Sequence, residues 1–274
     1  MYIISAVIDH EQSRVALYDR NYKLLLKKDG MPAELSKLCA DVITEGGIRS
    51  ADVDYVGVAV DPTAGSFASV AADLEKKINV KCCGASLMNA KALGEAYITD
   101  DVTSLLMIKI DDTVESGVVI DQKLYEGAHL RGGNVAHSVI NYGGFECRCG
   151  KRGCFEAYAS NSGLQRIAAE AGVAGAESIT HAKLFDMNTP EAERAKELYV
   201  KYFAGGLTNL INLFQLQELV LEGPFTEAGD KIMKPMMDII LREQFTHDMP
   251  NKCNVRFSHK ETDTALIGAA LIGR

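Results

Sequence analysis

Short apolar runs alternate with longer amphipathic segments along the whole chain. Short runs bounded by polar residues or glycine are typical of strands, and apolar residues three or four apart over longer stretches are typical of helices. We expect strands at 2–8, 14–17, 53–60, 80–83, 104–110, 117–120, 218–221 and 255–258. We expect helices at 31–46, 68–78, 89–98, 155–172, 190–214, 227–245 and 263–273. This alternation predicts an α/β fold with parallel strands.

Composition and charge narrow the range of functions. Hydrophobic residues make up 47% of the 274 residues, which is enough for a large core. The 29 Lys and Arg residues against 37 Asp and Glu residues give a net charge of −8, so the attraction that nucleic-acid binding needs is missing. No apolar run approaches the roughly 18 residues of a membrane span, and no basic residue precedes the first strand as in a signal peptide. We therefore expect a cytoplasmic protein with neither a nucleic-acid nor a membrane partner.

Four potential metal ligands lie within eighteen residues: His137, Cys147, Cys149 and Cys154. Three thiolates and an imidazole match a tetrahedral, sulfur-rich site, which suits zinc. Because protein atoms fill all four positions, the spacing predicts a structural Zn²⁺ site with no open position for a water molecule. The odd count of seven cysteines argues for a reducing compartment over a disulfide framework. The alternative is three free buried cysteines and an unrelated histidine.

Residues 147–160, which read C-R-C-G-K-R-G-C-F-E-A-Y-A-S, resemble the signature of the ROK family of bacterial sugar kinases and sugar-responsive repressors. Other segments resemble family patterns in the same order. Residues 89–95 resemble the end of N-D-A-N-A-A-A-L-G-E, residues 120–127 resemble I-D-G-K-L-Y-x-G, and residues 133–137 resemble G-E-x-G-H. Residues 207–229 and 266–270 resemble later family segments. The resemblance thus covers nearly the whole chain.

The resemblance implies a two-domain actin-like (ribonuclease-H-like) ATPase fold, a sugar bound between the domains, and a homodimer. We expect a smaller α/β domain at 1–98 plus 261–274, with the closing helix packed back on it, and a larger domain at 99–260 that carries the zinc loop. Family repressors have a helix-turn-helix ahead of the first strand. Since this chain starts at that strand, we expect a degenerate member that lacks the DNA-binding domain.

The family's sugar-binding positions correspond to Ser86, Asn134, His137 and Glu156. An amide such as that of Asn134 can still hydrogen-bond a hydroxyl. Two of these residues have simpler interpretations. His137 is favoured as a metal ligand alone, and the carboxylate of Glu156 suits the N-terminus of the helix that follows.

The resemblance fails at the positions that phosphoryl transfer needs. The family's catalytic Asp corresponds to Leu87, which cannot accept a proton, and no carboxylate lies between Lys81 and Lys91. The first phosphate loop, D-x-G-G-T in the family, falls in residues 8–14 and contains no glycine. The second, G-T-G-x-G-G-G, falls at 111–117. That segment holds three carboxylates, Asp111, Asp112 and Glu115. The family's adenosine-side G-G-G corresponds to Glu222, Gly223 and Pro224.

These departures favour a zinc-containing ROK protein that binds a sugar or sugar phosphate, or acts in regulation of carbohydrate metabolism, with a decayed phosphoryl-transfer site. No catalytic residue is assigned, and ATP with Mg²⁺ is not an expected cofactor. One alternative is an active, glucokinase-like hexose kinase with a relocated base at Asp9, Asp111 or Asp112. A second is a structural dimer subunit without a ligand.

Overall fold

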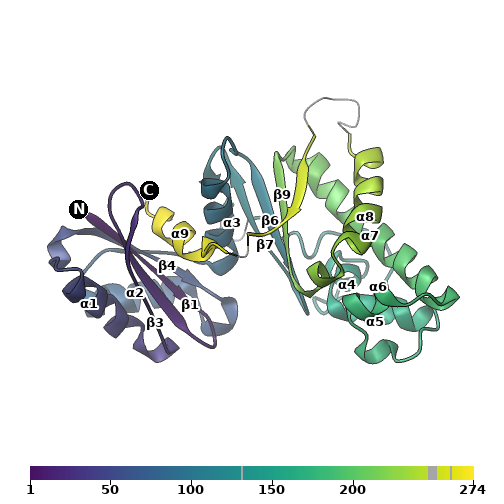
Figure 1. Cartoon of the computed structure of the whole chain (residues 1–274), viewed down its shortest axis with the longest axis horizontal. Helices are drawn as coiled ribbons and strands as arrows, with labels where there is room; N and C mark the ends of the chain where they lie inside the picture. The colour runs from purple at the N-terminus through teal and green to yellow at the C-terminus, as the bar shows by residue number, and fades with distance from the viewer. Residues whose placement is uncertain (131, 246–251, 260) are drawn as a thin grey trace. The chain divides into compact units, whose positions relative to one another are not determined.

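The computed structural model describes residues 1–130, 132–245, 252–259 and 261–274. The chain divides into two compact units, whose elements are labelled in Figure 1. The first unit comprises Met1–Thr103, Gly117–Tyr125 and His259–Arg274, and the second comprises Ser104–Ser116 and Glu126–Ser258.

The first unit is built on a five-stranded sheet in the order β3-β2-β1-β4-β5. Its strands are β1 (Tyr2–Ile8), β2 (Ser13–Tyr18), β3 (Leu24–Gly30), β4 (Val53–Val60) and β5 (Cys82–Ser86). Strands β1, β2 and β3 form an antiparallel meander, and β4 and β5 run parallel to β1. Its helices are α1 (Leu35–Glu45), α2 (Phe67–Ile78), α3 (Leu87–Ile98) and α9 (Thr264–Leu271).

Alternating residues of β1 build two cores on opposite faces of this sheet, as the two-residue period of a strand requires. Ile4 and Ile8 pack on the face that α1 and α2 cover, whereas Ile3 and Val7 pack on the face that α3 and α9 cover (Figure 1). Helices α3 and α9 approach closely through two glycines. A Cβ atom on Gly94 would lie 1.9 Å from the Thr264 carbonyl oxygen, and one on Gly268 would lie 1.7 Å from that of Ala90. Any larger residue there would push the helices apart.

A second five-stranded sheet has the order β10-β9-β6-β7-β8. Its strands are β6 (Leu105–Ile110), β7 (Val114–Ile120), β8 (Lys123–Leu124), β9 (Glu218–Glu222) and β10 (Asn254–Phe257). Strands β6, β9 and β10 are parallel. The helices of the second unit are α4 (Glu156–Ala159), α5 (Asn161–Glu170), α6 (His181–Asp186), α7 (Pro190–Phe214) and α8 (Asp230–Glu243). Figure 1 shows these helices gathered on one side of β6 and β9.

The α/β class predicted from the sequence is confirmed, and the differences are local. The helix expected at 155–172 is two helices, α4 and α5, because Ser160 is extended with ψ 168° and its hydroxyl accepts a hydrogen bond from the Gly163 N–H. Helix α3 begins two residues earlier than expected, and β5 begins two residues later than the strand expected at 80–83. Neither β3 nor α6 was predicted. Within the described ranges, no helix has both the length and the apolar character that crossing a bilayer requires.

Candidate functional site

The four predicted metal ligands come together in the second unit. One donor atom from each of His137, Cys147, Cys149 and Cys154 lies within 4.8 Å of every other. The Sγ atoms of Cys149 and Cys154 are 3.7 Å apart, and His137 Nδ1 lies 3.6 Å from Cys147 Sγ. A tetrahedral zinc with Zn–S bonds of about 2.3 Å separates two sulfurs by about 3.8 Å, and a sulfur and an imidazole nitrogen by about 3.6 Å. The donor spacing therefore fits zinc.

Backbone hydrogen bonds and glycines give the loop this shape. The Cys147 N–H donates to the Lys151 carbonyl and the Gly150 N–H donates to the Cys147 carbonyl, which closes a tight turn between the first and last thiols. Gly150 and Gly153 have φ of 85° and 79°, a region that other residues rarely adopt. A Cβ atom on Gly153 would also lie 1.9 Å from the Asn141 carbonyl oxygen. The C-G-x-x-G-C pattern thus has a conformational cause.

The thiols differ in environment. Cys147 and Cys154 are buried and Cys149 is exposed. Burial raises the pKa of Cys154 to about 12, whereas a hydrogen bond from the Lys151 N–H lowers the pKa of Cys149. A buried thiol with a raised pKa stays protonated at neutral pH unless its surroundings stabilise the thiolate, as a bound metal ion does. With four protein donors and no open position, this set suits a structural metal.

Glu156, a predicted sugar-binding residue, is the first residue of α4, and its buried carboxylate is hydrogen-bonded to Val114 and Arg148. Its Oε2 accepts a hydrogen bond from the Val114 N–H at 3.0 Å. Arg148 donates to both oxygens, from Nε to Oε1 at 2.7 Å and from Nη2 to Oε2 at 3.2 Å. The Glu156 carboxylate raises the pKa of Arg148, so the guanidinium stays charged. Sequence reasoning missed Arg148 as a site residue, although it stands between two of the predicted ligands.

The other predicted sugar contacts lie in different settings. Asn134 is exposed in the loop that precedes His137. Ser86 is in the first unit, where its hydroxyl accepts a hydrogen bond from the Asn89 N–H at 3.2 Å and caps α3. The residue after this cap is Leu87, which is predicted to replace the family's catalytic Asp. Leu87 is only 8% exposed and packs in the apolar cluster that includes Ile3 and Leu266.

Asp9, one of the three candidate relocated bases, shapes the β1–β2 hairpin. Its Oδ1 accepts hydrogen bonds from the N–H groups of Glu11 and Gln12, at 2.9 and 2.8 Å. This side-chain turn does locally what a glycine turn would otherwise do. Side chains therefore line the hairpin that is predicted to replace the family's glycine-rich phosphate loop.

The other two candidates lie in the turn between β6 and β7. Asp111 pairs with Lys109 Nζ at 2.8 Å and accepts a hydrogen bond from the Thr113 N–H at 2.9 Å. Burial alone would raise the pKa of Asp111, but these two partners outweigh burial and lower the pKa. Asp112 accepts a hydrogen bond from Asn161 Nδ2 at 2.9 Å. Both carboxylates thus contribute to the structure of the turn.

The loop after β9 is the segment that is predicted to replace the family's adenosine-side glycines. Gly223 is required there, because it has φ of 140° and a Cβ atom would lie 1.9 Å from the Ile110 carbonyl oxygen. Pro224 begins the short 3₁₀ helix Pro224–Ala228. Proline has no N–H to offer a phosphate, so this loop presents one donor fewer than a run of three glycines.

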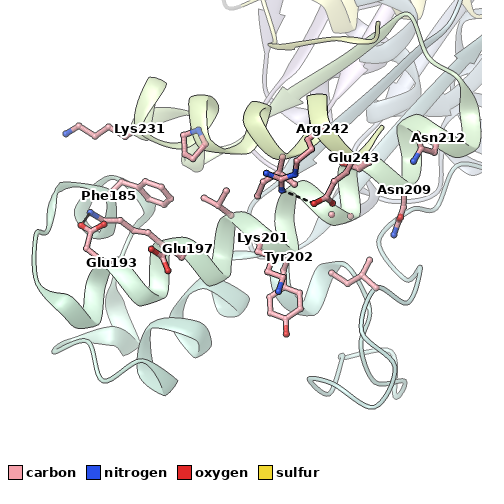
Figure 2. Close-up of a pocket in the computed structure, with 18 residues that line it drawn as sticks. Phe185, Glu193, Glu197, Lys201, Tyr202, Asn209, Asn212, Lys231, Arg242 and Glu243 are labelled. Carbon is pink, nitrogen blue, oxygen red and sulfur yellow. Dashed lines mark hydrogen bonds and ion pairs between the residues drawn. The ribbon is translucent and has the colours of Figure 1, made fainter. Parts of the chain in front are cut away.

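A groove of about 970 Å³ runs between α7 and α8 in the second unit, with Ile140 of the cysteine-rich region at its wall. Figure 2 shows Glu193, Glu197 and Lys231 toward one end and Arg242, Asn209 and Asn212 toward the other. Its lining combines acidic, basic and apolar side chains. No residue of this groove was among the predicted site residues, because its lining belongs to helix faces that form no motif.

Comparison with known proteins identifies relatives. Glucokinase from Halalkalibacterium halodurans is 30% identical over 165 residues, which cover 54% of this chain and 50% of the relative. The xylose repressor of Bacillus subtilis is 29% identical over 167 residues, which cover 60% of this chain and 43% of the repressor. The chain thus spans half or less of the length of these two curated relatives. Both matches concern a sugar-related protein, one an enzyme and one a repressor.

Solved structures share the fold over the whole chain. The ROK hexokinase from Thermus thermophilus superposes with a TM-score of 0.84 at 21% identity, covering 99% of this chain and 97% of that one. A ROK-family glucokinase from Streptomyces griseus, in complex with glucose and AMPPNP, superposes with a TM-score of 0.68 at 17% identity, and the superposition covers 99% of each chain. At these identities the likeness establishes the actin-like fold alone. The ROK family model matches residues 27–274. The chain therefore belongs to the ROK family.

Proposed function

We propose that this chain binds a sugar or sugar phosphate, and acts in regulation of carbohydrate metabolism, without transferring a phosphoryl group from ATP. The observation that carries this proposal is Leu87. Phosphoryl transfer to an alcohol needs a group that accepts or orients the hydroxyl proton. An aliphatic side chain packed into the core of the first unit can do neither.

Three further positions support the proposal independently. The hairpin after β1 is closed by the Asp9 side chain, and Glu11 and Gln12 occupy the turn in place of glycine. The turn after β6 is acidic, which disfavours a polyphosphate. Pro224 follows β9 and its single glycine. Each change removes something that a nucleotide phosphate requires, namely backbone donors, close approach or a neutral surface.

We further propose that His137, Cys147, Cys149 and Cys154 hold a structural zinc ion. Their donor spacing and the pair of buried thiols support this. When bound, the ion would supply a fixed charge that deprotonates the thiols, and it would brace the loop that carries Arg148 and leads into α4, where Glu156 lies. Sugar recognition in this unit would then fall to Glu156 and Asn134, with His137 acting as a ligand of the metal.

We also propose that the chain forms a homodimer through the groove between α7 and α8. The groove carries Glu193, Glu197 and Lys231 toward one end and Arg242 with Glu243 toward the other, and a second copy related by a two-fold axis would bring Glu197 of one copy near Arg242 of the other. At the C-terminal ends of the two helices, Leu213 and Phe245 are 73% and 77% exposed, and a partner would cover them.

Charge reversal tests this interface. We expect light scattering to show a dimer for the wild type and monomers for Glu197→Lys and for Arg242→Glu alone. The double variant should form the dimer again. Wild-type protein that remains a monomer at micromolar concentration would contradict the proposed interface.

Ligand binding tests the proposed function. We expect at least one of D-glucose, D-xylose, N-acetylglucosamine, N-acetylmannosamine, the 6-phosphates of the three hexoses or the 5-phosphate of xylose to raise the melting temperature and to give a measurable heat of binding, since a ligand that binds only the folded state stabilises it. No ATP should be consumed. Absence of any shift with every compound would favour a purely structural subunit, and sugar-dependent ATP consumption would favour an active kinase.

A further inference from the structure

The pair formed by Arg148 and Glu156 carries an inference that goes beyond sugar binding itself. The Glu156 side chain is 4% exposed, whereas that of Arg148 is 62% exposed. The guanidinium is thus the outward member of the pair, and the buried carboxylate lies behind it. Both carboxylate oxygens accept hydrogen bonds from Arg148, and Oε2 also accepts one from the Val114 N–H.

We propose that Arg148 competes with sugar hydroxyls for the Glu156 carboxylate and thereby sets a low affinity for neutral sugars. This inference rests on the proposed function, in which Glu156 is a sugar contact. A guanidinium that donates two hydrogen bonds to a carboxylate reproduces what a pair of neighbouring hydroxyls would donate. A neutral sugar must therefore displace Arg148 before it can use Glu156.

The surroundings of Arg148 favour the pair over a displaced position. Arg148 donates hydrogen bonds to both oxygens of the Glu156 carboxylate, and the negative charge of Glu115 acts on the guanidinium in the same direction. A neutral hydroxyl that replaces the guanidinium offers no charge to either carboxylate. Hydrogen bonds between two charged groups are stronger than those from a neutral hydroxyl, so Arg148 outcompetes a sugar hydroxyl for the buried Glu156 carboxylate.

Arg148 also has a matched control in the same loop. Arg152 lies four residues further on and pairs with Glu146 at 3.6 Å, with both side chains more than half exposed. An exposed pair of this kind contributes little. Replacing Arg152 therefore changes the charge of the loop by the same amount as replacing Arg148 and leaves Glu156 occupied.

The test is calorimetric titration of D-glucose, D-xylose and N-acetylglucosamine into the full chain and its variants, with zinc content measured in each preparation. We expect Arg148→Ala to bind at least one of these sugars at least tenfold more tightly than the wild type. Arg148→Lys, which keeps the charge without the planar fork, should be intermediate. Arg152→Ala should match the wild type. If Arg148→Ala binds less zinc than the wild type, the sugar titrations are read from Arg148→Met instead, because methionine keeps much of the aliphatic stem of arginine.

The outcomes separate the two proposals. Equal affinity in wild type and Arg148 variants overturns the competition and leaves sugar binding intact. Weaker binding in the variants also overturns it, because a residue that merely supports the site gives that result. If neither the wild type nor any variant binds a sugar or a sugar phosphate, both the inference and the proposed function fail.

Discussion

The cysteine-rich loop of the second unit and the first turn of α3 in the first unit both correspond to family motifs, yet their side chains are used in opposite ways. In the loop, all four potential ligands point their donor atoms at one small volume. In α3, Ser86 caps the helix and Leu87 fills the core. A motif position thus indicates chemistry only where the side chain presents a reactive atom. The four donor atoms of the loop are placed to hold a metal ion, whereas the residues at the start of α3 cap the helix and fill the core.

Removing a zinc ligand should have the largest effect. We expect elemental analysis to find about one zinc per chain, and Cys149→Ser to lose it and to lower the melting temperature by more than about 10 °C, because metal binding and folding of such loops are coupled. Cys83→Ser is the matched control, since Cys83 lies outside the cluster. If the protein contains no zinc and Cys149→Ser is as stable as the wild type, the cysteine-rich loop holds no structural metal and its contrast with α3 disappears.

An aspartate at position 87 of α3 should lower the stability of the protein nearly as much as loss of a zinc ligand. Leu87→Asp would bury a charge in an apolar cluster, and we expect it to destabilise the first unit by about 3 kcal/mol or more without creating kinase activity. Leu87→Met, which keeps the volume, should cost less than about 1.5 kcal/mol. Urea unfolding measures both variants. A stable Leu87→Asp protein that phosphorylates a hexose would show that only one residue separates this site from a working one.

Acid should destabilise the second unit through His181, away from the cysteine-rich loop. Burial lowers the pKa of His181 to about 4, and its Nε2 lies 2.8 Å from the Tyr199 hydroxyl. The neutral form is therefore favoured in the folded state. Its contribution is complete above the unfolded-state pKa of about 6.5 and falls as the pH drops toward 4, by up to about 3 kcal/mol.

His181→Phe isolates this effect, because the variant still carries the cysteine-rich loop. Between pH 7 and pH 4.5, wild-type stability in urea should fall more steeply than that of His181→Phe. Parallel pH profiles would instead assign the acid sensitivity to the zinc ligands, which must also bind protons when the metal leaves.

The smallest effect is expected at Ser86. If its hydroxyl serves as the cap of α3, Ser86→Ala should destabilise by about 1 kcal/mol and Ser86→Asp should restore the loss. Sugar affinity, measured by calorimetry, should follow a different order if Ser86 is also a contact, because a carboxylate and a hydroxyl do not bind the same group. Equal stability of Ser86→Ala and wild type would contradict the capping role.

The sequence allowed the fold class and the set of clustered metal ligands to be predicted, because both depend on local regularities. Strand and helix periodicity is readable over a few residues, and the C-x-C-G-x-x-G-C spacing restricts the loop through the glycines Gly150 and Gly153. The break between α4 and α5 had a readable signal too, since Ser160 is a common helix cap, but the apolar pattern runs across it and suggested one helix.

The rest depended on contacts between distant segments. Nothing in the sequence near Arg148 indicates that it pairs with Glu156 and not with solvent, because Glu156 lies eight positions further along the chain, beyond the turns of the cysteine-rich loop. The groove between α7 and α8 arises from the packing of two helices whose outward faces are ordinary mixtures of charged and apolar residues. The burial of Leu87 likewise depends on α9, at the far end of the chain.

The central claim is that this chain transfers no phosphoryl group from ATP to a sugar. The most direct test is ³¹P NMR of the wild-type protein with ATP, Mg²⁺ and each of the sugars named above. We predict no sugar phosphate and no ADP beyond the rate in buffer over several hours. Formation of a sugar phosphate that disappears in Asp9→Asn, Asp111→Asn or Asp112→Asn would contradict the claim and identify the relocated base.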